Sequence, residues 1–186
     1  MNNTSISNWM AWEGGVDLVA VTAANLPMPN VIMHVARVVH TPVGSAPSGM
    51  VCWQSNPSAA PEVMGFVSTD ARVGAYFGPK IFAGTPFEKA PVLTAKIDTG
   101  INADTAWSRI EVGGFVFETR LTKLGASQLI QRAPAAMPPF WQQGVEINAG
   151  AAEFKVNGKP VPVIIPPTGI SGGPAAVASP CGIYAR

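Results

Sequence analysis

The sequence predicts a single mainly β domain, with a barrel-like or sandwich-like core and few short helices. Its 186 residues fit one domain of ordinary size. The apolar residues, many of them β-branched, fall into short runs separated by 19 glycines and 18 prolines, a share below that of disordered chains. Runs of this kind, bounded by turn residues, predict about eight to ten short strands.

The N-terminal half is expected to supply a lead-in and the first strands. Residues 1–15 are polar around Trp9 and Trp12, which predicts a loosely ordered lead-in, and residues 16–26 suit a helix or a strand equally well. Residues 31–40 form the first clear strand; because both of its faces are mainly apolar, we expect it to be buried. Further short strands are expected at 49–54, 63–67 and 73–77, with loops at 42–48 and 54–61.

Two glycine-containing turns predict hairpins in the C-terminal half. After an alternating strand at 92–98, Gly113-Gly114 supplies the positive φ angles of a tight turn that joins 106–112 to 115–121. This turn places Val112 opposite Phe115. Asn157-Gly158 predicts a second hairpin, in which the prolines after the turn mark an edge strand. Between the hairpins we expect a helix or bent connection at 123–132 and a Pro-rich lid or rim at 133–141.

The composition limits the partners. Only 12% of the residues are charged and the net charge is +1, which favours a homo-oligomer or a large substrate cavity. The basic residues form no stripe, so nucleic acid is not an expected partner. No apolar run reaches the roughly 18 residues of a membrane-spanning helix, so a membrane is not expected either. Because the N-terminus lacks a basic segment followed by an apolar one, we expect a cytoplasmic protein.

Few motifs of established chemistry are present. The glycine-rich run 171–174 lacks the Lys-Ser/Thr pair of a phosphate loop. His34 and His40 lie six residues apart on one predicted strand, hence on one face, but no third ligand accompanies them, so we expect no metal and no cofactor. Cys52 and Cys181 are expected to be small buried side chains, and a disulfide between them stays open.

One lysine stands out by its surroundings. Lys80 follows Gly78-Pro79, which predicts a sharp turn just before it, and Phe77, Ile81 and Phe82 flank it. An amine among apolar groups either extends its charge to water or gives up part of that charge. The uncharged amine can attack a ketone and form a Schiff base. A structural lysine and a nucleophile are therefore both open.

The run Phe-Gly-Pro-Lys-Ile-Phe-Ala at 77–83 resembles the Gly-Phe-Pro-Lys-Lys-Leu-Ala signature of the acetoacetate decarboxylase family. The resemblance spans residues 31–124 and implies an open β-barrel around an apolar pocket, with Lys80 in the place of the Schiff-base lysine. It implies a small keto acid or ketone as ligand and a decarboxylase-like lyase activity. The first two residues of the signature are inverted and Ile81 replaces its second lysine. A relative that binds a small apolar or ketonic ligand, with or without covalent chemistry, fits better than full activity.

Supporting roles follow from sequence position. We expect Arg37 to hold a substrate carboxylate, and Glu62 to donate a proton or to orient Lys80. The substrate pocket is expected to be lined by Tyr76, Phe77, Phe82 and Met64. The alternative is a non-enzymatic β-domain that self-assembles or carries a ligand, which the low charge and the edge prolines favour. An assembly domain would leave Lys80 on a surface or in an interface.

Overall fold

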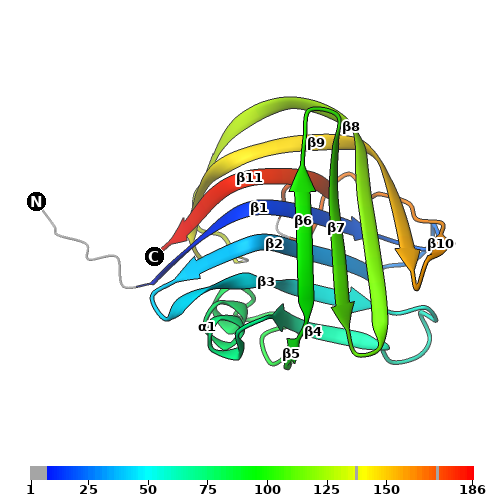
Figure 1. The fold of residues 1–186 in the computed structure, drawn as a ribbon, viewed down its shortest axis with the longest axis horizontal. Helices are drawn as coiled ribbons and strands as arrows, with labels where there is room; N and C mark the ends of the chain where they lie inside the picture. Colours follow the sequence, from blue (N-terminus) through cyan, green and yellow to red (C-terminus); the bar gives the residue numbers. More distant parts are fainter. Residues whose placement is uncertain (1–7, 137, 171) are drawn as a thin grey trace, which may run out of the picture.

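A computed structural model describes residues 8–136, 138–170 and 172–186. Within this part of the chain one large sheet and one short helix form, so the predicted mainly β class is confirmed (Figure 1). The sheet order is β5-β4-β3-β2-β1-β11-β9-β8-β7-β6, with β10 beside β9. The elements are β1 (Trp9–Ala20), β2 (Val31–Thr41), β3 (Gly44–Trp53), β4 (Val63–Ser68), α1 (Ala71–Ile81), β5 (Val92–Thr94), β6 (Lys96–Ile101), β7 (Thr105–Val112), β8 (Phe115–Arg132), β9 (Trp141–Val156), β10 (Lys159–Val161) and β11 (Ala176–Ala185).

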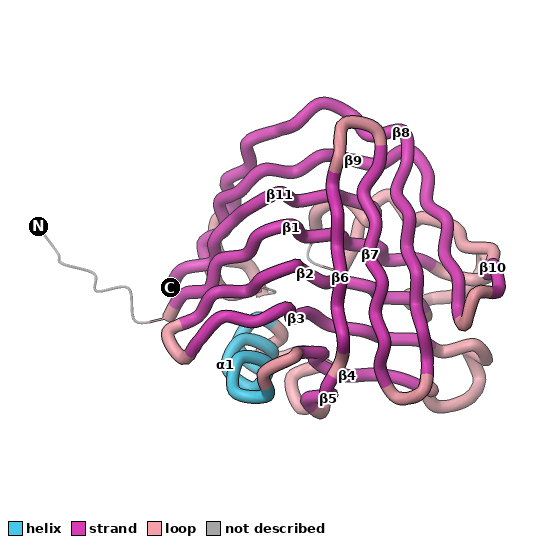
Figure 2. Tube along the Cα trace, viewed as in Figure 1, coloured by secondary structure: helices cyan, strands magenta, loops and turns pink. Residues whose placement is uncertain are grey.

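The sheet bends until it is nearly a closed barrel. β6 and β7 cross in front of the central strands, and β6 contacts β1, β2 and β3 (Figures 1 and 2). Irregular pairing, which bends and twists strands, occurs in several neighbouring strands of the sheet. The register shifts between Ala36 and Val39 in β2, between Leu124 and Ser127 in β8, and between Ala178 and Gly182 in β11. In β1, Gly14 has a φ of 63°.

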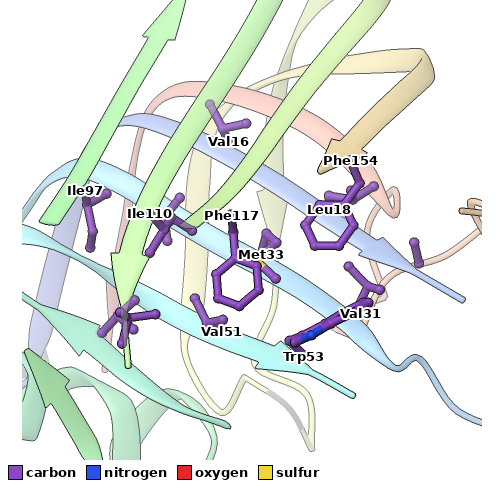
Figure 3. Packing of buried hydrophobic residues seen from close by; sticks show 14 of the residues in the cluster. Val16, Leu18, Val31, Met33, Val51, Trp53, Ile97, Ile110, Phe117 and Phe154 are labelled. Atoms are coloured by element: carbon purple, nitrogen blue, oxygen red, sulfur yellow. The ribbon is translucent and has the colours of Figure 1, made fainter. Parts of the chain in front are cut away.

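The barrel core lies between the central strands and the strands that cross them. Val16 and Leu18 of β1 point toward Ile110 of β7 and Phe117 of β8 (Figure 3). The Phe117 ring stacks on that of Phe154 with 6.2 Å between centroids. Removal of this apolar surface from water is the main stabilising contribution to such a fold.

Both predicted hairpins are confirmed. Gly113 and Gly114 have φ angles of 58° and 82°, and Val112 pairs with Phe115. Asn157 and Gly158, with φ angles of 51° and 75°, join β9 to β10. Because β10 pairs with β9 alone, it is an edge strand, as its proline indicates.

The strand expected at 73–77 is wrong, since these residues belong to α1. Val73, Phe77 and Ile81 recur at helical spacing and are buried on one face of the helix. Asp70 caps the helix by accepting a hydrogen bond from the Arg72 backbone N–H at 2.8 Å. Lys80 therefore lies in the last turn of a helix and does not follow a sharp turn.

Other local expectations also need correction. Residues 9–15 of the predicted lead-in belong to β1, which begins at Trp9, and residues 1–7 lie outside the described part. The expected helix or bent connection at 123–132 continues β8 across its register shift. The expected loop at 42–48 lies largely in β3, and the single strand expected at 92–98 divides at Ala95 into β5 and β6. Both cysteines are free thiols, and Cys181 is exposed rather than buried.

Two buried hydroxyls carry a stability prediction. Ser108 and Thr119 are cross-strand partners in β7 and β8, and neither hydroxyl has a hydrogen-bond partner in the described residues. An unpaired buried hydroxyl costs free energy, so we expect the double variant Ser108→Ala/Thr119→Val to raise the free energy of unfolding in urea by about 1 kcal/mol. Thr41→Val is the matched control, because the Thr41 hydroxyl donates to the Gly44 carbonyl at 2.9 Å; it should lower stability. A destabilised double variant would contradict the prediction.

Candidate functional site

A pocket lies on the outer face of the sheet, opposite the barrel core. Val16 and Leu18 point into the core, so Asp17 between them points to the outer face and lines the pocket. Phe77 of α1 and the side chain of Ile170 pack over this face and wall the pocket. The cavity measures about 60 Å³. One ordered water needs roughly 10–15 Å³ of such space, so the cavity suits a few waters or a small ligand.

An aspartate and a histidine form one polar pair in the pocket. Asp17 and His34 lie directly opposite each other in β1 and β2, and His34 Nδ1 lies 2.6 Å from Asp17 Oδ1. Burial lowers the pKa of the imidazole, but the charge of Asp17 and its hydrogen bond outweigh this effect and raise the pKa above its usual value. The Nδ1–H donates its hydrogen bond to the Asp17 carboxylate. The other ring nitrogen, Nε2, has no hydrogen-bond partner among the described residues and is free for a ligand.

A glutamate and an arginine form the second pair. Arg132 donates from Nη1 and Nη2 to the two oxygens of Glu146, at 2.6 and 2.7 Å, and from Nη1 to Gln142 Oε1 at 3.1 Å. Hydrogen bonding to Glu146 raises the pKa of Arg132. Glu146 and Gln142 are buried and line the pocket. The absence of a side chain at Gly173 makes room for the guanidinium, because a Cβ there would lie 3.2 Å from Arg132 Nη2.

Tyr184 and Trp12 form the aromatic end of the pocket. Their ring centroids are 5.0 Å apart, and Trp12 Nε1 donates to Ser179 Oγ at 2.9 Å. Tyr184 is only 5% exposed, yet its hydroxyl has no hydrogen-bond partner in the part of the chain that the structure describes. Burial raises the pKa of this phenol, as do the charges of Asp17 and Glu146, while Arg132 opposes them. The phenol therefore stays protonated at neutral pH and is available as a donor.

The groups predicted to be catalytic lie apart from this pocket and from one another. Lys80 Nζ donates to the Tyr76 carbonyl at 3.2 Å and lies over the Tyr76 ring, 3.7 Å from its centroid. Arg37 is exposed and pairs with Glu13 at 3.0 Å. Glu62 accepts hydrogen bonds from the hydroxyl and backbone N–H of Ser55, chiefly the former, and this lowers its pKa.

The four predicted lining residues are divided among several environments. Phe77 lines the main pocket, and with Tyr76 and Lys80 it also lines a small adjoining cavity of about 10 Å³. Phe82 packs between Phe66 and Phe87. Met64 packs against the cluster that contains Cys52. The structure thus brings Tyr76, Phe77 and Lys80 together, and the roles assigned to all of these residues stay predictions.

Sequence reasoning missed most of the pocket. The sequence places His34 and His40 on one face of a strand without a third metal ligand. The shared face is wrong, because the pairing shifts between Ala36 and Val39. His40 instead contacts Ser45 at 2.8 Å and Glu13 at 3.3 Å. In the described residues no group of three potential ligands is placed to hold a metal ion. The sequence does contain one indication of the pocket, the single carboxylate of Asp17 within an apolar run. A buried carboxylate needs a polar partner, so Asp17 indicates a polar site.

Comparisons with known proteins define neither a family nor an activity. No family model matches the chain, and no curated protein matches it in sequence. Its fold is similar to the crystal structure of acetoacetate decarboxylase from Legionella pneumophila, with a TM-score of 0.40, 9% sequence identity, and coverage of 100% of this chain and 88% of that chain. A likeness at this level leaves the predicted family resemblance around Lys80 a prediction. No helix in the described ranges is long and apolar enough to cross a membrane.

The Asp17–His34 pair carries a prediction on pH. We expect Asp17→Asn to lower the pKa of His34, measured by NMR of the imidazole signals, which His40→Gln assigns because the chain has two histidines. Since the folded-state pKa of His34 is raised, the stability that the pair contributes is fully present below the unfolded pKa and is lost as the pH rises through the folded one. The stability gap between wild type and Asp17→Asn should therefore narrow from pH 5 to alkaline pH. A gap that widens would contradict this assignment.

Proposed function

We propose that the protein is a small-molecule enzyme or binder whose site is the outer-face pocket, with His34 as its acid–base group. The proposal rests on two polar groups at one small, largely apolar cavity, the Tyr184 hydroxyl and His34 Nε2, neither of which has a hydrogen-bond partner among the described residues. Apolar pockets with a few convergent polar groups are the usual form of small-molecule sites.

The Asp17–His34 pair supplies the chemistry. A carboxylate that accepts from Nδ1 fixes the tautomer and the orientation of an imidazole, and leaves Nε2 to accept or donate a proton. The register of β1 and β2 holds both side chains on rigid strands. Trp12, Phe77 and Val39 supply apolar walls to the pocket, and the His34 side chain is 37% exposed and so accessible to an entering molecule.

The two histidines provide the test. A panel of small alcohols, ketones, amines and carboxylates is titrated into the protein, and the imidazole signals are followed by NMR. We expect some compounds to shift the His34 signals and to leave those of His40, which lies on the opposite face, unchanged. Ala36→Leu fills the pocket and should abolish the response. The proposal fails if no compound moves His34, or if both histidines respond alike.

Schiff-base chemistry at Lys80 is a separate hypothesis with its own test. Its support is the signature-like run at 77–83 and the aromatic surroundings of the amine. Because the amine is held against the Tyr76 carbonyl and ring, we expect borohydride treatment with small keto acids and ketones to give no ligand-dependent adduct on Lys80 by peptide mapping. An adduct that disappears in Lys80→Ala would replace the proposal above with the Schiff-base mechanism.

A further inference from the structure

The charges around the pocket disfavour an anionic ligand. Its charged groups are Asp17, Glu146 and His34, with Arg132 behind Glu146. Two carboxylates against one guanidinium and one imidazole give a formal charge of zero or minus one. Both terminal nitrogens of Arg132 are already bonded to Glu146. Among the described residues that line the pocket there is no lysine or arginine to hold a carboxylate or phosphate, so the site suits a neutral molecule.

The free polar groups specify what that molecule carries. Tyr184 is 5% exposed and lines the cavity, and its hydroxyl has no acceptor among the described residues, so it is a donor for a ligand oxygen. Tyr184 lines the same cavity as Asp17 of one ion pair and Glu146 of the other. A donor held in an apolar site stabilises negative charge that develops on a bound oxygen far better than water does.

The base lies at the same cavity. His34 is fixed through Nδ1 by Asp17, and its Nε2 is left for the ligand. His34 and Tyr184 line the same cavity of about 60 Å³, so we expect one ligand to reach both. A phenol donor and a base that face one small neutral molecule form the arrangement needed to remove a proton from carbon next to a carbonyl group.

We propose that the pocket binds a neutral carbonyl compound, and that His34 and Tyr184 catalyse its enolisation. This inference rests on the proposed function. The carbonyl oxygen accepts a hydrogen bond from the Tyr184 hydroxyl. His34 Nε2 takes a proton from the neighbouring carbon, the electron pair of that C–H bond forms the carbon–carbon double bond, and the carbonyl π pair moves to oxygen. Return of a proton from the imidazolium to carbon restores the ketone, so no co-reactant is consumed.

The test is hydrogen–deuterium exchange of ketone protons. Cyclopentanone and acetone, with pyruvate as the anionic comparison, are incubated with the protein in deuterated buffer, and loss of the α-proton signals is followed by NMR against a free-imidazole control. We expect exchange of the neutral ketones above that control, lowered at least tenfold in His34→Gln and in Tyr184→Phe. His40→Gln is the matched histidine control and should exchange at the wild-type rate. Tyr184→Phe removes a hydroxyl that bonds no described residue, so its fold should be intact, as a thermal melt will show.

Binding and chemistry are separated by following the His34 signals in the same samples. Ketones that shift His34 but exchange no faster than the control overturn the enolisation proposal and leave the proposed function standing. Absence of both responses for every compound, pyruvate and the wider panel included, overturns both. Faster exchange of pyruvate than of the neutral ketones overturns the neutral-ligand assignment, and unchanged exchange in Tyr184→Phe overturns the role of the phenol.

Discussion

Replacement of Arg132 by methionine is expected to lower the free energy of unfolding by about 3 kcal/mol, because it leaves a buried carboxylate without its counter-ion. Glu146 is 7% exposed, and both of its oxygens accept from the guanidinium. Methionine retains much of the apolar stem of arginine, so the loss reports mainly on the charge. Arg132 itself is partly exposed, which places the expected loss at the lower end of the range for broken buried pairs. Urea unfolding at neutral pH measures it.

The double variant Arg132→Met/Glu146→Gln is the matched control for this prediction. Glutamine has the shape of glutamate without its charge, so the double variant should recover most of the stability that the single variant loses. If the double variant is no more stable than Arg132→Met, the loss comes from packing and the argument from the unpaired charge is wrong.

Gly49→Ala is expected to have a comparably large effect, about 3 kcal/mol or a failure to fold, because the added methyl group collides with backbone. A Cβ at Gly49 would lie 2.1 Å from the His34 carbonyl oxygen and 2.6 Å from the Val35 Cα. These atoms belong to β2, which pairs with β3 at this position, so they cannot retreat without breaking the sheet. The same displacement would move His34 away from Asp17.

Gly125→Ala is the matched control for Gly49→Ala, since it places the same methyl group in another strand. Its nearest neighbour would be the Asn148 carbonyl oxygen at 3.5 Å, an ordinary contact. Thermal unfolding of the two variants should show a large loss for Gly49→Ala and a small change for Gly125→Ala. Equal stability of the two variants would mean that the β2 backbone shifts to accommodate the added methyl group, contrary to our expectation.

Local features of this fold could be predicted because their causes are local. The hairpin at Gly113-Gly114 follows from the φ angles that its turn requires, and the turn then sets the pairing of Val112 with Phe115. Helix α1 was missed although its signal is present. Asp70 is a capping residue, and Val73 and Phe77 follow at helical spacing, but a short apolar run with a β-branched and an aromatic residue also suits a strand.

The pocket could not be predicted in the same way, because its parts come from distant strands. Asp17 meets His34 through the β1–β2 register, whereas Glu146 and Tyr184 arrive on β9 and β11. Pairing between distant strands leaves no local mark in a sequence. A register shift also interrupts the alternation of side chains between the two faces of a strand. For this reason His34 and His40 lie on different faces, although regular alternation predicts a shared one. The run around Lys80, in contrast, is visible in the sequence because its residues are neighbours in the chain.

The pairing of β1 with β11 has a consequence for how the protein folds. Trp9 lies opposite Ala185, and Leu18 lies opposite Ala176, so the centre of the sheet joins segments from opposite ends of the described chain. Contacts of such long sequence separation make folding slow. On the ribosome, β1 can pair with β2 early, but its other edge stays open until β11 has been synthesised. During that interval the chain presents an apolar strand edge to other molecules, which makes this the stage at which we expect aggregation to compete with folding.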